Sequence, residues 1–304
     1  MRLVVRTFAR GVRTASCPLL LVAAGVHAAE RPARTPIDAA EILRRAEDVR
    51  SPDFDYALEV AIRSRSADGR SPERNATFAM VAHGKTHTMF LRRTPPVLSD
   101  SVFLIADGRH WALMPRAAKP LELLEGKVIY GEIASGDIAR LDFSRSWSAA
   151  LVGEERFEDD PCYKLELERT GGTGIYTRVL YWIAKSGFLP RRLEYHGTTT
   201  QRLVHMARYE NYRNTSLGLR PLRMVIEGGN PWEEINVLDF SNLRRIDASP
   251  LAFSEEGMLR FRNAATENRE PGSGSVITME AVRGRLAAMP PPSSPREPAA
   301  LRDK

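Results

Sequence analysis

The sequence has 304 residues and a formal net charge of +6 at pH 7, and 43% of its residues are hydrophobic. Residues 1–28 contain four arginines and no acidic residue, so removal of that segment would lower the charge to +2. A charge this small gives no argument for nucleic-acid binding. A chain that starts after residue 28 keeps one cysteine, Cys162, which excludes an internal disulfide.

Residues 1–28 have the layout of a secretory signal peptide. Arginines precede an apolar core from Pro18 to about Val26, and the small residues Ala28 and Ala29 follow. The apolar core has roughly ten residues, about half the length that a membrane-spanning helix needs. The sequence therefore predicts export to the periplasm through a cleavable signal, cut after Ala28 or Ala29, and no transmembrane segment.

The first predicted element after the signal is a helix in the stretch TPIDAAEILRRAEDVRSP, residues 35–52. Thr35 is a candidate N-cap, and Pro36 suits the first helical turn. An apolar stripe at helical spacing is formed by Ala39, Ile42, Leu43, Ala46 and Val49. Ser51-Pro52 ends the helix because the residue before a proline avoids the helical conformation.

Segments in which apolar and polar residues alternate follow this helix, and alternation is typical of strands with two different faces. In DYALEVAIRSRS, for example, Tyr56, Leu58 and Val60 share one face. Short turns containing Asp-Gly, Lys-Ser-Gly or Gly-Gly separate the segments. About eleven strands joined in this way predict a mainly β, α+β domain over residues 29–263, built on one antiparallel sheet.

Two further helices are predicted within this domain, over residues 135–153 and 249–261. From residue 264 the composition changes to glycine and a cluster of prolines at 290–292. Residues 264–304 are therefore predicted to be a mobile tail, in which 275–289 could form one helical segment.

Motifs for several kinds of chemistry are missing. The sequence has no G-x-S-x-G, H-E-x-x-H, G-x-x-x-x-G-K-[ST] or G-x-G-x-x-G pattern. His83 and His87 are the nearest pair of histidines after the signal, but a turn separates them, which favours surface residues over metal ligands. His110 could face Ser101 across a hairpin, but no third partner can be named. We therefore predict no catalytic residue, metal or cofactor, and a protein that is not an enzyme.

A sheet of about eleven strands curls or closes because the twist of its strands accumulates. If only short helices cover it, its apolar face can exceed what its own side chains fill, which leaves a cavity for an apolar guest. The candidate cavity residues are large, pliable side chains: Phe78, Met80, Met89, Leu91, Trp182, Met224 and Ile226. Any one of them could instead pack the core against a helix.

The stretch SVFLIADGRHWALMP, residues 101–115, predicts two strands joined by a two-residue turn at Asp107-Gly108. Trp111 and Leu113 share one strand face, and His110, Ala112 and Met114 share the other. Trp111 is a further candidate for the cavity wall. The alternative, that its face packs onto a covering helix, stays open.

Four stretches resemble the outer membrane lipoprotein-sorting protein family, the LolA-like group. They are IDAAEILRRAEDVRSP, DGRHWALMPRAAK, SWSAALVGEERFEDDPCYKLELE and YWIAKSGFLPRRLEYH, within residues 38–262. The last three, in this order and spacing, resemble a branch of the family whose members are mostly uncharacterised. The resemblance implies an incomplete antiparallel barrel with helices over its open mouth.

The resemblance also implies a non-enzymatic periplasmic carrier that binds acyl chains of lipoproteins or other lipids. The alternative is an envelope sensor or interaction module that binds a membrane protein, such as an exporter or a signalling partner. A lipid hydrolase acting through Ser101 or His110 is a third possibility. No functional residue of the family can be placed on this sequence.

Overall fold

The computed structural model describes residues 37–123, 128–130, 133–134, 143–171, 176–197, 202–229 and 234–267. The predicted signal, residues 1–28, and residues 268–304 of the predicted tail lie outside these ranges. The helices of the described part are α1 (Ala39–Arg50), η1 (Pro96–Leu98), α3 (Phe143–Ser146), η2 (Pro250–Ala252) and α4 (Glu255–Glu267). The predictions of a first helix and of a helix over residues 249–261 are confirmed, and α4 extends four residues into the predicted tail.

One antiparallel sheet dominates the described part of the chain. Its first strands are β1 (Tyr56–Ser66), β2 (Arg74–His83), β3 (His87–Thr94), β4 (Val102–Ala106), β5 (Arg109–Leu113) and β6 (Leu121–Leu123). Its remaining strands are β9 (Trp147–Phe157), β10 (Asp160–Arg169), β11 (Tyr176–Ala184), β12 (Pro190–Gly197), β13 (Leu203–Thr215), β14 (Gly218–Gly228) and β15 (Glu234–Arg245). β7 (Val128–Tyr130) and β8 (Ile133–Ala134) form a separate pair.

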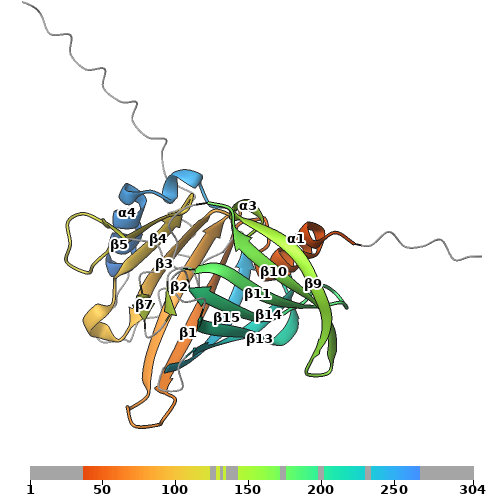
Figure 1. The fold of residues 1–304 in the computed structure, drawn as a ribbon. Coiled ribbons are helices and arrows are strands. Elements are labelled where there is room, and N and C mark those ends of the chain that lie inside the picture. Colours follow the sequence, from red (N-terminus) through yellow and green to blue (C-terminus); the bar gives the residue numbers. More distant parts are fainter. Residues whose placement is uncertain are drawn as a thin grey trace, which may run out of the picture. The chain divides into compact units, whose positions relative to one another are not determined.

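The spatial order is β6-β5-β4-β3-β2-β1-β15-β14-β13-β12-β11-β10-β9, so neighbours in sequence are neighbours in the sheet (Figure 1). β1 pairs with β15 and thereby joins the two halves. β6 and β9 are the edges and do not pair with each other, so the sheet is open. The predicted mainly β fold on one large antiparallel sheet is confirmed.

The described sheet has thirteen strands rather than about eleven, because the sequence analysis missed β6 and β9. The prediction of a helix over residues 135–153 is wrong from Trp147 onward, where β9 pairs with β10. Only Phe143–Ser146 is helical in the described part of that segment, and residues 135–142 lie outside it. Side chains along β9 are largely exposed, so its apolar residues do not alternate with the period of a half-buried strand.

Both faces of the sheet carry buried apolar residues, and a different helix covers each. On the α1 face, Leu58, Phe78 and Tyr181 pack in one cluster with Ile42 and Leu43 of helix α1. On the opposite α4 face, a second cluster joins β1 to β5 with η2 and α4; its members include Met89, Leu91, Trp111, Phe253 and Met258. Helix α1 contacts β9, β12 and β14, whereas α4 contacts β3, β4 and β5 (Figure 1).

The β4–β5 hairpin turns at Asp107-Gly108 as predicted. Both residues have positive φ, 49° and 79°, as a two-residue type I′ turn requires. The register of the hairpin pairs His110 with Ile105. The hydroxyl of Ser101 donates a hydrogen bond to the Leu98 carbonyl at 2.9 Å. Ser101 and His110 are therefore not cross-strand neighbours. The hydrolase hypothesis required these two residues to face each other across the hairpin, and they do not.

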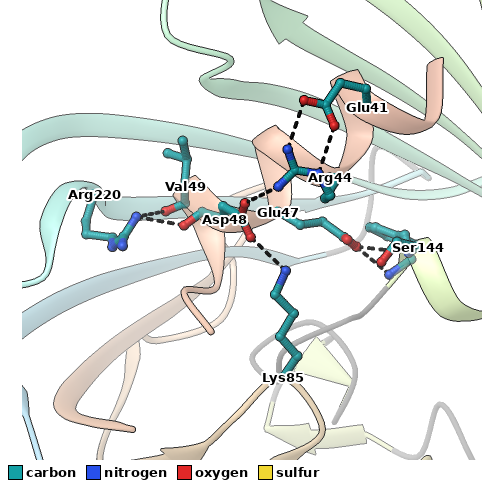
Figure 2. A network of polar contacts seen from close by, with 9 residues as sticks. Glu41, Arg44, Glu47, Asp48, Val49, Lys85, Ser144 and Arg220 are labelled. Atoms are coloured by element: carbon teal, nitrogen blue, oxygen red, sulfur yellow. Dashed lines mark hydrogen bonds and ion pairs between the residues drawn. The ribbon is translucent and has the colours of Figure 1, made fainter. Parts of the chain in front are cut away.

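Polar contacts hold the C-terminal half of α1 in place (Figure 2). The carboxylate of Glu47, 1% exposed, accepts hydrogen bonds from the backbone N–H groups of Phe143 (2.5 Å) and Ser144 (3.3 Å) at the start of α3. Asp48 accepts from Lys85 of the β2–β3 turn at 2.7 Å. Glu47 thus joins α1 to α3, and Asp48 joins it to the sheet.

Asp55, just before β1, joins the β2–β3 turn to the segment that precedes η2. Its carboxylate accepts from the backbone N–H groups of Gly84 (3.2 Å) and Ala248 (2.9 Å), and its Oδ1 lies 2.9 Å from Nδ1 of His83. The rings of His83 and His87 each lie 5.7 Å from the Phe253 ring, measured between centroids. The two histidines therefore help to dock η2 on the sheet.

Glu47→Ala is expected to lower the free energy of unfolding by about 1–3 kcal/mol, because it removes the shared acceptor of two backbone N–H groups in a buried place. Urea denaturation monitored by circular dichroism measures the loss. Glu41→Ala, on the exposed side of the same helix, removes surface ion pairs to Arg44 and Arg45 and should cost at most about 1 kcal/mol. Equal losses for the two variants would contradict the role assigned to Glu47.

His87 should make the fold weaker at mildly acidic pH. Burial lowers the pKa of His87 below its ordinary value, and His83 adds to this while Asp107 opposes it. The folded state thus favours the neutral ring of His87. The stability that the neutral ring contributes is fully present above the unfolded pKa of about 6.5 and is lost as the pH falls through the folded pKa. Between about pH 7.5 and 5.5, the melting temperature of wild type should fall more than that of His87→Gln. Equal falls in melting temperature for wild type and His87→Gln over this pH range would refute the expectation.

Candidate functional site

A cavity of about 60 Å³ lies at the C-terminal end of helix α1, on the α1 face of the sheet. Arg50, Ser51 and Pro52 line it from the helix end. Its wall on the sheet is mainly apolar and includes Leu58, Met80, Met224, Phe240 and Leu243. The cavity therefore combines a charged end with an apolar wall that is continuous with the covered face of the sheet.

Helix α1 ends at this cavity because Ser51 precedes Pro52 and leaves the helical conformation, with φ −139° and ψ 89°. The last carbonyl groups of a helix lack partners within it. Arg220 of strand β14, which α1 contacts, is a hydrogen-bond partner for these carbonyl groups. Its Nη1 donates to the carbonyl oxygens of Asp48 (2.9 Å) and Val49 (2.8 Å), as Figure 2 shows. Arg220 thus caps the helix and brings a second guanidinium group to the cavity, which it also lines.

Arg50 extends from the last turn of α1 and is half-buried. Its Nη1 donates to the hydroxyl of Tyr209 at 3.4 Å, and its guanidinium carbon lies 5.3 Å from the centroid of the Phe143 ring. Burial alone would lower the pKa of Arg50, but interactions with Tyr209, Tyr181 and Glu47 outweigh it and raise the pKa. The cavity therefore keeps a fixed positive charge.

Aromatic side chains continue across the α1 face from Arg50. The hydroxyl of Tyr176 lies 3.2 Å from Nδ1 of His205, and the ring centroids of Tyr195 and His205 are 4.5 Å apart. Tyr181 is fully buried, and its hydroxyl has no hydrogen-bond partner among the described residues. Burial raises the pKa of Tyr181 well above its ordinary value, so the hydroxyl is neutral at pH 7.

The structure distributes the eight predicted cavity residues over three places. Met80 and Met224 line the cavity, and Phe78 and Ile226 lie in the same cluster on the α1 face. On the α4 face, buried under η2 and α4, lie Met89, Leu91 and Trp111. Trp182 belongs to a third cluster with Cys162, and its indole N–H donates to Glu155 at 3.0 Å. Four of the candidates therefore share the face that carries the cavity.

The sequence analysis did not single out Arg50, Glu47 or Arg220. A signal for the first two was present: Glu47 and Arg50 follow Leu43 by four and seven residues, which places both on the apolar side of the helix. No pattern within the sequence connects Arg220 to Asp48, because 172 positions separate them.

No group of three or more histidine, cysteine or acidic side chains suitable for a metal ion occurs within the described ranges. No helix among the described residues is long and apolar enough to span a membrane.

Several solved structures share the fold of this chain. The LolA superfamily protein NE2245 from Nitrosomonas europaea is 27% identical, with a TM-score of 0.67 over 73% of this chain and 99% of its own. A DUF1329 family protein from Desulfovibrio piger is 19% identical, with a TM-score of 0.65 over 72% of this chain and 97% of its own. A domain from Vibrio parahaemolyticus described as outer membrane lipoprotein-sorting is 15% identical, with a TM-score of 0.63 over the same shares.

No curated protein matches the sequence. A family model described as "uncharacterized protein" matches residues 84–282, which is more than half of the chain. In chain order, this region contains the strands from β3 to β15 and helix α4, but not β1 and β2. The chain therefore belongs to this family of uncharacterized proteins, and its fold is that of the LolA superfamily.

Proposed function

We propose that this chain is a non-enzymatic carrier or binding protein for lipidated or other apolar cargo, a class that includes outer-membrane lipoproteins. The observation that carries the proposal is the cavity between the end of α1 and an apolar sheet face. The shared fold with NE2245 and with the Vibrio domain supports the same role. The proposed cargo contacts are Phe78, Met80, Met224 and Ile226.

The cavity must widen to accept an acyl chain. Its volume of about 60 Å³ is well below the roughly 300–1,000 Å³ of typical ligand pockets. Helix α1 covers the apolar face next to it, so a shift of α1 away from the sheet would extend the cavity along that face. We therefore assign α1 the role of a displaceable cover.

The energies of burial favour such a displacement. Ile42 and Leu43 of α1 are fully buried against the sheet, and burying a side chain of this size contributes about 1.5–3 kcal/mol. A palmitoyl chain of roughly 15 methylenes contributes about 12 kcal/mol at about 0.8 kcal/mol for each. An acyl chain can thus replace the apolar stripe of α1 with a net gain, while the competition from α1 keeps its binding reversible.

Export to the periplasm is part of the proposal, because lipoproteins pass through this compartment on their way to the outer membrane. Its support is the sequence of residues 1–28, with arginines, an apolar core and small residues in order. A partner in the envelope would supply and receive the cargo.

Organic extraction and mass spectrometry of the protein purified from the periplasm of its own host should find about one acyl species bound per chain. Leu243→Trp places a larger side chain in the cavity wall, where overfilling costs about 1–3 kcal/mol, so the retained lipid should fall about tenfold. Leu251→Trp is the matched control because Leu251 is exposed on η2 and does not line the cavity. A wild-type protein without lipid would overturn the carrier proposal and favour the sensor or interaction module.

The mature protein isolated from the periplasm should begin at Ala29 or Glu30, with residues 1–28 or 1–29 removed. N-terminal sequencing, supported by the intact mass, determines the first residue. Replacing Ala28 by an arginine should slow cleavage, because the site requires small residues. A periplasmic protein that retains Met1 would contradict processing at this site.

A further inference from the structure

The charges around the cavity are all of one sign. Arg50 and Arg220 line it, and no aspartate or glutamate is among the described residues that do so. The nearest acidic side chains lie along α1. Glu47 accepts from the N–H groups at the start of α3 and also interacts electrostatically with Arg50, whereas Asp48 pairs with Arg44 and Lys85. The two guanidinium groups of Arg50 and Arg220 thus outweigh the one carboxylate of Glu47, so the charge at the helix end is positive on balance.

The C-terminal end of a helix would ordinarily repel an anion, because the last carbonyl groups of the helix carry partial negative charge. Arg220 offsets this effect here, since it donates to the carbonyl groups of Asp48 and Val49. The hydroxyl of Tyr209, which accepts from Arg50, belongs to the same wall and can orient a polar ligand atom. The charged end of the cavity thus suits an anion, although it lies at a helix C-terminus.

The apolar part of the wall begins directly beside the two arginines. Met80, Met224 and Leu58 line the cavity and belong to the cluster that extends under helix α1. A ligand that occupies both parts must be apolar along its length and negative at one end.

We infer that the cavity selects amphiphiles with an anionic head group, of which a long-chain fatty acid is the simplest, and that Arg50 is the residue that distinguishes a charged from an uncharged head group. The inference rests on the proposed function, because it assigns a cargo class to the same cavity. A guanidinium group matches a carboxylate through two parallel hydrogen bonds, and such charge-assisted bonds are stronger than neutral ones. The acyl chain then follows the apolar wall beneath α1.

Fluorescence titration of the full mature protein with cis-parinaric acid and with its methyl ester tests the inference. The two probes share one chain and differ in the charge of the head group. Wild type should bind the acid about tenfold more tightly than the ester, as expected for a hydrogen bond to a charged group. Arg50→Met should reduce this ratio to near one, mainly by weakening the binding of the acid. Arg50→Lys keeps the charge but not the two parallel donors, so it should retain only part of the ratio.

Arg63→Met is the matched control. Arg63 pairs with Asp239 on the surface and does not line the cavity, so the ratio should stay as in wild type. Thermal unfolding establishes that each variant is folded, and the wild-type ratio stands as a test even if Arg50→Met fails to fold. Equal binding of acid and ester by wild type would overturn the anionic head group and leave the apolar carrier intact. Binding of neither probe would count against the proposed function itself.

Discussion

Helix α1 lies on an apolar sheet face although its buried side carries two charged residues, Glu47 and Arg50. A buried carboxylate costs several kcal/mol unless it is hydrogen-bonded, and the N–H groups at the start of α3 satisfy this need for Glu47. The hydroxyl of Tyr209 on β13 accepts a hydrogen bond from Arg50, and Arg220 on β14 donates to a carbonyl group at the helix end. These partners come from three elements that meet at one place, so they fix the position of α1, which apolar packing alone would leave free to slide.

Alternation of apolar and polar residues predicted the sheet, the Asp107-Gly108 pair predicted the hairpin, and an apolar stripe at helical spacing predicted the first helix, because each signal depends on neighbours in sequence. The alternation could not assign the two faces of the sheet, because in β2 both Phe78 and Ala79 are buried. Phe78 packs in the cluster of the α1 face, whereas Ala79 packs in the cluster with η2 and α4. Met89 and Trp111 could therefore line a cavity or contact a helix, as far as the local sequence shows. The outcome depends on where α4 docks, and α4 lies more than 140 positions later in the chain.

Strand β9 shows where local preference and long-range pairing disagree. Ser148, Ala149, Ala150 and Leu151 include strong helix formers, and local propensity favours a helix there. In the sheet, however, this segment pairs with β10 over its whole length, with a shift in register next to Leu151. Pairing decides the structure because it satisfies the backbone of an exposed segment and of its neighbour at once. The same limit hid Arg220, whose role arises only when β14 crosses the end of α1.

The contacts of α1 differ between its two halves, and this difference bears on how the helix could act as a cover. The bonds that join it to α3, Lys85, Tyr209 and β14 come from residues 47–50. In the N-terminal half, Glu41 pairs with Arg44 and Arg45 within the helix, and Ile42 and Leu43 bind the sheet by apolar contact. Apolar contact is what an acyl chain can replace, whereas a buried hydrogen bond has no substitute in a hydrocarbon. A cargo-driven displacement would thus lift the N-terminal half first and pivot α1 about the end that holds Arg50, so that the cation stays at the cavity while the apolar face opens.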